Sequence, residues 1–136
     1  MKIYPGFKLS IKKSFSNNDI VAFSTISGDK NQLHLDELYA SKSRFGKRIC
    51  HGMLIGSLFS NIIGNNFPMS IYLNQTLSFK APVYIDEEVK AEIEIEQIKK
   101  NILTLNTLII KNDNTVALEG KAIVMIDNIK DYIYYH

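Results

Sequence analysis

The residues best suited to acid–base chemistry are an aspartate and a histidine in one polar stretch. Asp29 and His34 lie five positions apart, with Asn31 between them. A histidine titrates near neutral pH and a carboxylate can hold a water molecule, so the two could act together on water. Because a spacing of five does not place both side chains on one face of a helix, a loop would have to bring them together. From the spacing alone, Asp29 and Asn31 could equally be turn-forming residues and His34 a hydrogen-bonded loop histidine.

A second candidate lies where a long apolar segment begins, at Cys50, His51 and Gly52. If a helix starts at Gly52, its free backbone N–H groups favour a carbonyl or negatively charged oxygen, as in an oxyanion site. We interpret Cys50 as a small buried thiol. We interpret His51 as a structural residue that fixes the loop through a side-chain hydrogen bond. Close packing alone would also explain a glycine at this position.

The apolar segment 52–64 predicts the helix that would position Gly52. Its apolar residues cover most of the circumference, which is typical of a buried helix. Small residues recur every four positions and would form a stripe along one side: Gly52, Gly56, Ser60 and Gly64. A serine in such a helix more often bonds the carbonyl one turn back than acts as a nucleophile.

Two further helices are expected earlier in the chain. Ser16 is a suitable N-cap for a helix that Gly28 would end. Residues 28–32 have the composition of a loop, and Asp36 can cap a short helix over 37–42.

After Pro68 the apolar residues follow a period of two, which indicates strands. With an edge strand near the N-terminus, the expected strands are 7–15, 71–80, 89–96, 102–111 and 116–126. This order predicts an α+β fold in which an antiparallel sheet wraps around a central buried helix. We expect one domain over 1–136, with a core at about 7–126 and a tail, 127–136, that the pattern does not place. The exposed sheet edges favour a second subunit.

The composition argues against several classes of protein. The formal net charge of +2 is too small to indicate nucleic-acid binding, and one cysteine allows no intramolecular disulfide. The N-terminus has no continuous apolar signal segment, and the apolar helix is too short to span a membrane. Three histidines and one cysteine give no metal-ligand pattern. We therefore expect a cytoplasmic protein that needs no metal, nucleic acid or membrane.

Three stretches of the chain resemble the MaoC-like, (R)-specific enoyl-CoA hydratase family of hot-dog proteins. The stretch from Asp29 to His34 matches the family pattern D-x-N-P-x-H, and His51–Met53 matches H-G-M/L. The run 71–83 resembles the family's strand after the central helix. The resemblance covers about residues 7–126 and implies a single hot-dog domain. Gln32 stands where the family usually has a proline.

The resemblance implies a hydro-lyase of fatty acid metabolism, an enoyl-CoA hydratase that also runs as a 3-hydroxyacyl-CoA dehydratase. Asp29 and His34 would activate a water that adds to a trans-2-enoyl thioester, giving an (R)-3-hydroxyacyl thioester. The Gly52 N–H would bind the thioester carbonyl as negative charge builds there. Asn31, Ser60 and His51 would support the site. The resemblance implies no cofactor.

The resemblance also implies a homodimer, or a dimer of dimers, with the sites near the interface. A dehydratase acting on acyl-carrier-protein thioesters is an alternative, because a basic cluster could bind either CoA phosphates or an acidic carrier protein: Lys42, Arg44, Lys47 and Arg48. A non-catalytic acyl-thioester-binding protein and a thioesterase are two further candidates, and the intact D-x-N-x-x-H pattern argues against both. Among bulky residues, Phe59, Tyr72 or Leu73 could close a short acyl pocket.

Overall fold

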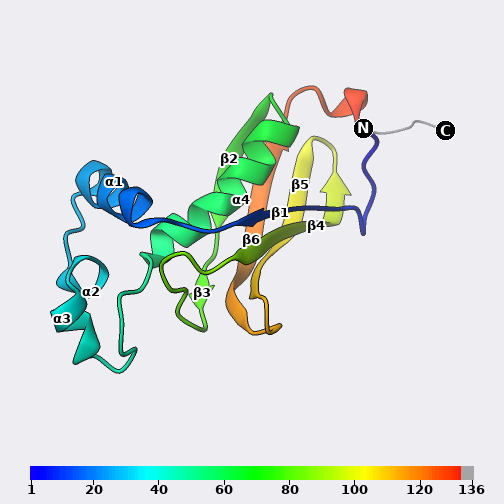
Figure 1. Cartoon of the computed structure of the whole chain (residues 1–136). Coiled ribbons are helices and arrows are strands. Elements are labelled where there is room, and N and C mark those ends of the chain that lie inside the picture. Colours follow the sequence, from blue (N-terminus) through cyan, green and yellow to red (C-terminus); the bar gives the residue numbers. More distant parts are fainter. Residues whose placement is uncertain (133–136) are drawn as a thin grey trace.

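The central element of the fold is helix α4, Gly52–Asn66, which lies against one face of an antiparallel sheet (Figure 1). The computed structural model describes residues 1–132. One face of α4 joins the sheet in a shared apolar core, to which the helix contributes Ile55, Leu58, Phe59, Ile62 and Ile63. The predicted α+β arrangement of a sheet around a central helix is confirmed.

The sheet has the strand order β1-β4-β5-β6-β2, and the short strand β3 also pairs with β6. All of its pairings are antiparallel. The strands are β1 (Lys8–Lys13), β2 (Ser70–Gln75), β3 (Ser78–Phe79), β4 (Val89–Lys99), β5 (Ile102–Lys111) and β6 (Val116–Ile126). In β4, burial alternates from Val89 to Ile95, as the period of two predicts. β1 is an edge strand, as expected, and β5 is central.

Helix α4 is less completely buried than its composition predicts. Met53 at its start is 62% exposed, and Ser60 is also exposed. The stripe of small residues serves close packing over part of its length only. A Cβ on Gly56 would lie 3.6 Å from a methyl group of Leu77, whereas Gly64 faces open space. The sequence could not separate the two faces of α4 because apolar residues occur on both.

The single strand expected over 71–80 is wrong, because the chain breaks between β2 and β3. At the break, the Thr76 N–H donates to the Lys121 carbonyl of β6 at 2.9 Å. Thr76 approaches β6 so closely that a Cβ on Gly120 would lie 1.8 Å from the Thr76 carbonyl oxygen. Only glycine fits under this crossing, and the period-two pattern of one strand does not reveal a crossing over another.

Three short helices gather at the N-terminal end of α4 (Figure 1). They are α1 (Asn17–Ser27), α2 (Gln32–Leu35) and α3 (Glu37–Ser41). Ser16 and Asp19 form a reciprocal capping box on α1, and Gly28 ends α1 with φ 81°, as predicted. Asp36 caps α3 by accepting from the Tyr39 N–H. The loop expected over 28–32 is one residue shorter, because Gln32 already begins α2.

The tail that the sequence did not place packs against the N-terminus. The 3-10 helix η1 covers Ile129–Asp131, and Ile129 is buried. The Ile3 N–H donates to the Tyr132 carbonyl at 2.8 Å, and the Tyr132 ring contacts Phe67 edge-on. The rest of the tail, 133–136, lies outside the described residues. In the part of the chain that the structure describes, no helix is long and apolar enough to cross a membrane.

Candidate active site

His34 is held in one orientation by the backbone of a distant segment. It lies on α2, is 8% exposed, and its Nδ1 is 2.8 Å from the Ile49 carbonyl oxygen. A carbonyl only accepts hydrogen bonds, so Nδ1 carries the proton in this contact. The other ring nitrogen, Nε2, is then left with a lone pair that can accept a proton. This is the protonation pattern that a general base requires.

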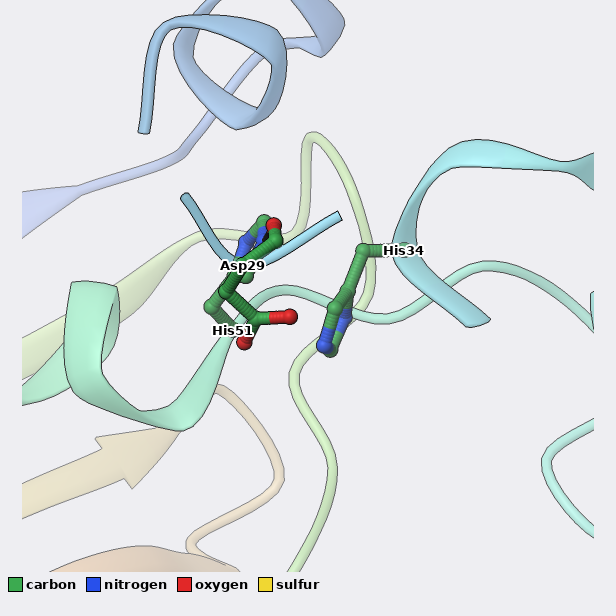
Figure 2. A group of neighbouring side chains, drawn as sticks. All are labelled: Asp29, His34 and His51. Atoms are coloured by element: carbon green, nitrogen blue, oxygen red, sulfur yellow. Dashed lines mark hydrogen bonds between the residues drawn. The ribbon is translucent and has the colours of Figure 1, made fainter. Parts of the chain in front are cut away.

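Asp29 reaches the same place from the loop between α1 and α2. Its Oδ1 accepts from the Asn31 N–H at 3.1 Å, and Asn31 in turn caps α2 by accepting from the Leu33 N–H. In Figure 2, the Asp29 carboxylate lies beside the rings of His34 and His51. One ligand-type atom from each of the three side chains lies within 4.8 Å of the others. The loop therefore brings Asp29 and His34 together, and the two hydrogen bonds of Asn31 stabilise the loop and the start of α2.

His51 connects the two residues. Its ring stacks on His34, with the ring centroids 3.9 Å apart. Its Nε2 lies 3.3 Å from the Asp29 carbonyl oxygen and 3.0 Å from Ser24 Oγ. The hydrogen bond to a carbonyl places the proton on Nε2, so Nδ1 has a lone pair, and this buried atom has no hydrogen-bond partner among the described residues. The expected side-chain hydrogen bond of His51 is present.

The surroundings of His51 on balance disfavour its protonated form. Burial lowers the pKa of His51 below its usual 6.5, and the charge that His34 can carry lowers it further. Sequence reasoning missed Ser24, which holds this ring. Ser24 lies four residues after buried Ile20 in α1, and a polar residue on the buried face of a helix was the available signal.

Gly52 begins α4 beside this group. Its backbone N–H has no partner within residues 1–132, as expected for the first turn of a helix. The ring of Phe79 covers Gly52 so closely that a Cβ would lie 2.6 Å from the ring. A side chain at position 52 would displace Phe79 or narrow the approach to the N–H group.

These residues line one cavity of about 590 Å³. Asp29, His34, His51 and Gly52 form its polar part. The rest of its wall is largely apolar and includes Met53, Ile55, Phe79, Pro82, Val83 and Leu118. Two cationic side chains, Arg44 and Lys80, also line it. An acyl chain can bury its methylene groups against such a wall, with the reactive end beside the polar residues.

Several residues singled out in the sequence lie elsewhere. Ser60 is exposed on α4 and does not line the cavity. Phe59 is fully buried in the core, while Tyr72 and Leu73 are exposed on β2, so none of the three closes this cavity. Cys50 does line the cavity, but it is buried, and burial raises the pKa of its thiol to about 12, with nearby acidic residues adding to the effect. It is therefore a thiol and not a nucleophile at neutral pH.

Arg48 differs from the exposed basic residues with which the sequence grouped it. Its side chain is only 11% exposed and is engaged with groups of the protein. Lys42, Arg44 and Lys47 are exposed, as a charged surface requires.

Asp29, His34 and His51 are also residue types that ligate metals. Their ligand-type atoms lie within 4.8 Å of one another. One nitrogen of each ring is already hydrogen-bonded to a main-chain carbonyl, Nδ1 of His34 to Ile49 and Nε2 of His51 to Asp29. That the protein needs no metal remains a prediction.

Comparison with known proteins identifies the family. Residues 4–117 match the model of the MaoC like domain. The chain belongs to the MaoC-like domain family. The match spans the sheet up to the start of β6, the central helix and all the residues of the candidate site. The resemblance noted in the sequence is thus confirmed.

Two characterised relatives of this MaoC-like protein illustrate the activities in its family. It is 42% identical over 125 residues to an (R)-specific enoyl-CoA hydratase of Aeromonas caviae, covering 89% of this chain and 93% of the relative. It is 39% identical over 128 residues to a mitochondrial 3-hydroxyacyl-[acyl-carrier-protein] dehydratase of Solanum lycopersicum, covering 91% of this chain and 78% of the relative.

Solved structures agree with these relatives in fold. The (R)-hydratase from A. caviae involved in PHA biosynthesis superposes with a TM-score of 0.88 at 40% identity, covering 91% of this chain and 97% of that one. The R-hydratase PhaJ1 from Pseudomonas aeruginosa gives a TM-score of 0.86 at 35% identity, with 91% and 82% covered. The hot-dog fold expected from the sequence is confirmed.

Proposed function

We propose that this MaoC-like protein is an (R)-specific enoyl-CoA hydratase that reversibly adds water to trans-2-enoyl thioesters. The observation that carries this proposal is the Asp29–His34 pair beside the free Gly52 N–H in one apolar-walled cavity. Water addition needs a base, a proton donor and a group that stabilises an oxyanion, and the cavity offers all three. The 42% identity to the A. caviae hydratase supports the same activity.

In the proposed reaction, the thioester carbonyl binds at the Gly52 N–H and the acyl chain lies along the apolar wall. His34 Nε2 takes a proton from a water held by Asp29, and the resulting hydroxide oxygen bonds to Cβ. The electron pair of the Cα–Cβ double bond moves toward the carbonyl and forms an enolate, whose oxygen accepts from Gly52. A proton from the Asp29–His34 pair then adds to Cα, which restores the protein and completes the addition of one water.

The oxyanion contact is expected to be a large contribution. Loss of one such donor costs about 2.7–4 kcal/mol in other enzymes. General acid–base catalysis adds about 10²–10⁴-fold. We assign positioning roles to Asn31, which caps the α2 turn, and to His51, which stacks on His34. We propose no direct role for Ser60 in this chain, because its side chain lies outside the cavity.

A dehydratase acting on acyl-carrier-protein thioesters is the second candidate. The identity of 39% to the S. lycopersicum dehydratase supports it. The exposed cations Arg44 and Lys47 could bind either an acidic carrier protein or the phosphates of CoA. The choice between CoA and an acyl carrier protein does not change the proposed reaction, because the Asp29–His34 pair acts on the acyl end of either thioester. A complete hydration site does not favour a non-catalytic binding protein or a thioesterase.

The test compares carriers and product configuration. Purified protein is given crotonyl-CoA and, separately, the same acyl group on an acyl carrier protein, and the loss of enoyl-thioester absorbance is followed. We expect faster hydration of the CoA thioester and a product with the (R) configuration by chiral chromatography. A clear preference for the carrier-protein thioester would favour the second candidate. Absence of hydration with both, at short and longer chain lengths, would refute the proposal.

We further propose that the protein is a homodimer in the cytoplasm. β2 pairs with β6 on one side only, and its exposed apolar side chains need cover. Ile71 and Leu73 are 48% and 51% exposed. The free, buried thiol of Cys50 is consistent with a reducing compartment.

A further inference from the structure

Arg48 makes three contacts with the segments that carry and surround His34. Its Nε donates to the His34 carbonyl oxygen at 2.7 Å, and one terminal nitrogen donates to Asn17 Oδ1 at 2.7 Å. The other terminal nitrogen lies 3.5 Å from a Glu37 carboxylate oxygen. One planar guanidinium thus joins the starts of α1 and α3 to the turn of α2. Lysine cannot reproduce this arrangement, because its single ammonium is a point charge.

The next residue holds the other end of His34. The Ile49 carbonyl accepts from Nδ1 of the His34 ring, while the Arg48 side chain binds the His34 main chain. The dipeptide Arg48-Ile49 therefore fixes both the backbone and the ring of His34.

The dipeptide is itself anchored to another segment. Ile49 forms a β-bridge with Tyr84, and the Cys50 N–H donates to the Val83 carbonyl at 2.8 Å. These contacts give Arg48-Ile49 a fixed place beside the cavity. A side chain that holds a catalytic group from a fixed frame limits its movement relative to substrate.

We propose that Arg48 is the positioning residue of His34, and that it acts on the reaction by holding the His34 turn against residues 48–50. The proposal rests on the proposed function, since it presumes that His34 is the base. Arg48 does not line the cavity of the candidate site, whose wall includes His34 and Ile49. A binding role for Arg48 would raise KM, whereas a positioning role lowers kcat.

The test measures kinetics in Arg48→Met and Arg48→Lys. We expect kcat of Arg48→Met to fall roughly 10- to 100-fold, the loss that a misplacement of about 1 Å can cause, with KM changed less than about twofold. Arg48→Lys keeps the charge but reaches fewer acceptors, so we expect it to recover part of kcat. Lys12→Met is the matched control for loss of one positive charge, because Lys12 is exposed on β1, far along the chain from the site. We expect that control to keep wild-type kcat.

A second measurement does not depend on activity. The chain has three histidines, so ¹⁵N-histidine NMR can follow the His34 ring, with His34→Gln to assign its signals. We expect the Nδ1–H form of His34 in the wild type and a mixture of ring forms in Arg48→Met. If Arg48→Met does not fold, the same comparison is made with Arg48→Lys.

Two results decide the proposal. A folded Arg48 variant that keeps the Nδ1–H form and a kcat within twofold of Lys12→Met would overturn it. A wild-type protein that hydrates no enoyl thioester would instead refute the proposed function, and the NMR comparison would still decide whether Arg48 positions the His34 ring.

Discussion

At the scale of single residues, the site depends on two histidines whose protonation is set by backbone carbonyls. The Ile49 carbonyl fixes the proton of His34 on Nδ1, and the Asp29 carbonyl fixes that of His51 on Nε2. Each ring therefore keeps a lone pair on its other nitrogen, Nε2 of His34 and Nδ1 of His51. The resemblance predicts that Asp29 and His34 meet. It does not predict the ring forms, because these depend on carbonyl groups 15 and 22 residues away in the chain.

The lowered pKa of His51 predicts that the free energy of unfolding decreases in acid. Its pKa is lowered in the folded protein, so below pH 6.5 the unfolded chain takes up a proton that the folded chain resists. The free energy of unfolding should therefore fall as the pH drops from 7.5 to 5, and each tenfold difference in proton affinity is worth about 1.4 kcal/mol. Urea unfolding at several pH values measures this fall, with His51→Asn as the comparison.

The variant should be less stable at pH 7.5 and should lose less stability on acidification than the wild type. The pKa values of the Asp19 and Asp113 carboxyl groups lie below their usual 3.8. These two groups therefore affect the free energy of unfolding only at a pH below the range of 5 to 7.5. An equal loss in both proteins would contradict the assignment to His51.

At the scale of elements, capping signals predicted the ends of α1 and α3, but α2 was not predicted, and strand periodicity missed the break between β2 and β3. Ser16, Gly28 and Asp36 mark real helix ends, because capping acts within a few residues. The break after β2 depends on β6 passing under Thr76, and the exposure of Met53 depends on which face of α4 meets the sheet. The residues of β2 and of α4 alone therefore do not reveal the break or the exposed face.

The α2 turn explains why Gln32 can stand where the family usually has proline. Gln32 is the first residue of α2, a position at which proline is favoured because its missing N–H costs no helix bond. Asn31 before it has φ −57° and ψ 127°, a conformation that suits a residue preceding proline. The family's proline and Gln32 therefore fit the same backbone.

We expect Gln32→Pro to stabilise the protein by about 0.4–1 kcal/mol, because it restricts the unfolded chain. Hydratase activity should be unchanged. Leu33→Pro is the matched control, since the Leu33 N–H donates to the cap Asn31 and its loss should destabilise the site. Denaturant unfolding measures the stability of both variants, and kcat measures their hydratase activity. Destabilisation by Gln32→Pro would show that the α2 turn differs from this description.

At the scale of the whole molecule, one sheet around one helix leaves an edge that a second chain can cover. Composition and the order of helices and strands predicted this architecture, because a helix apolar on most sides and strands apolar on one side have few other ways to pack. The tail was beyond such reasoning, since its burial depends on contact with Phe67 and the distant N-terminus.

Light scattering with size-exclusion chromatography should give a mass twice that of the 15.5 kDa chain. Ile71→Lys on the edge strand β2 should shift the protein toward the monomer, because it buries a charge in the proposed interface. Ile26→Lys is the matched control, since Ile26 on α1 is 85% exposed and far from β2 in the sequence. A wild-type monomer, or equal masses for the two variants, would count against an interface at β2.

The central claim is that Asp29 and His34 together hydrate an enoyl thioester. Its most direct test is the rate of absorbance loss with crotonyl-CoA for the wild type, Asp29→Asn and His34→Gln. Asp127→Asn, at an exposed position, is the control for loss of one carboxylate, and circular dichroism checks that each variant folds. We predict a fast wild type and control, and a fall of roughly 10²–10⁴-fold in both site variants. Hydration at wild-type rates by either folded site variant would contradict the claim.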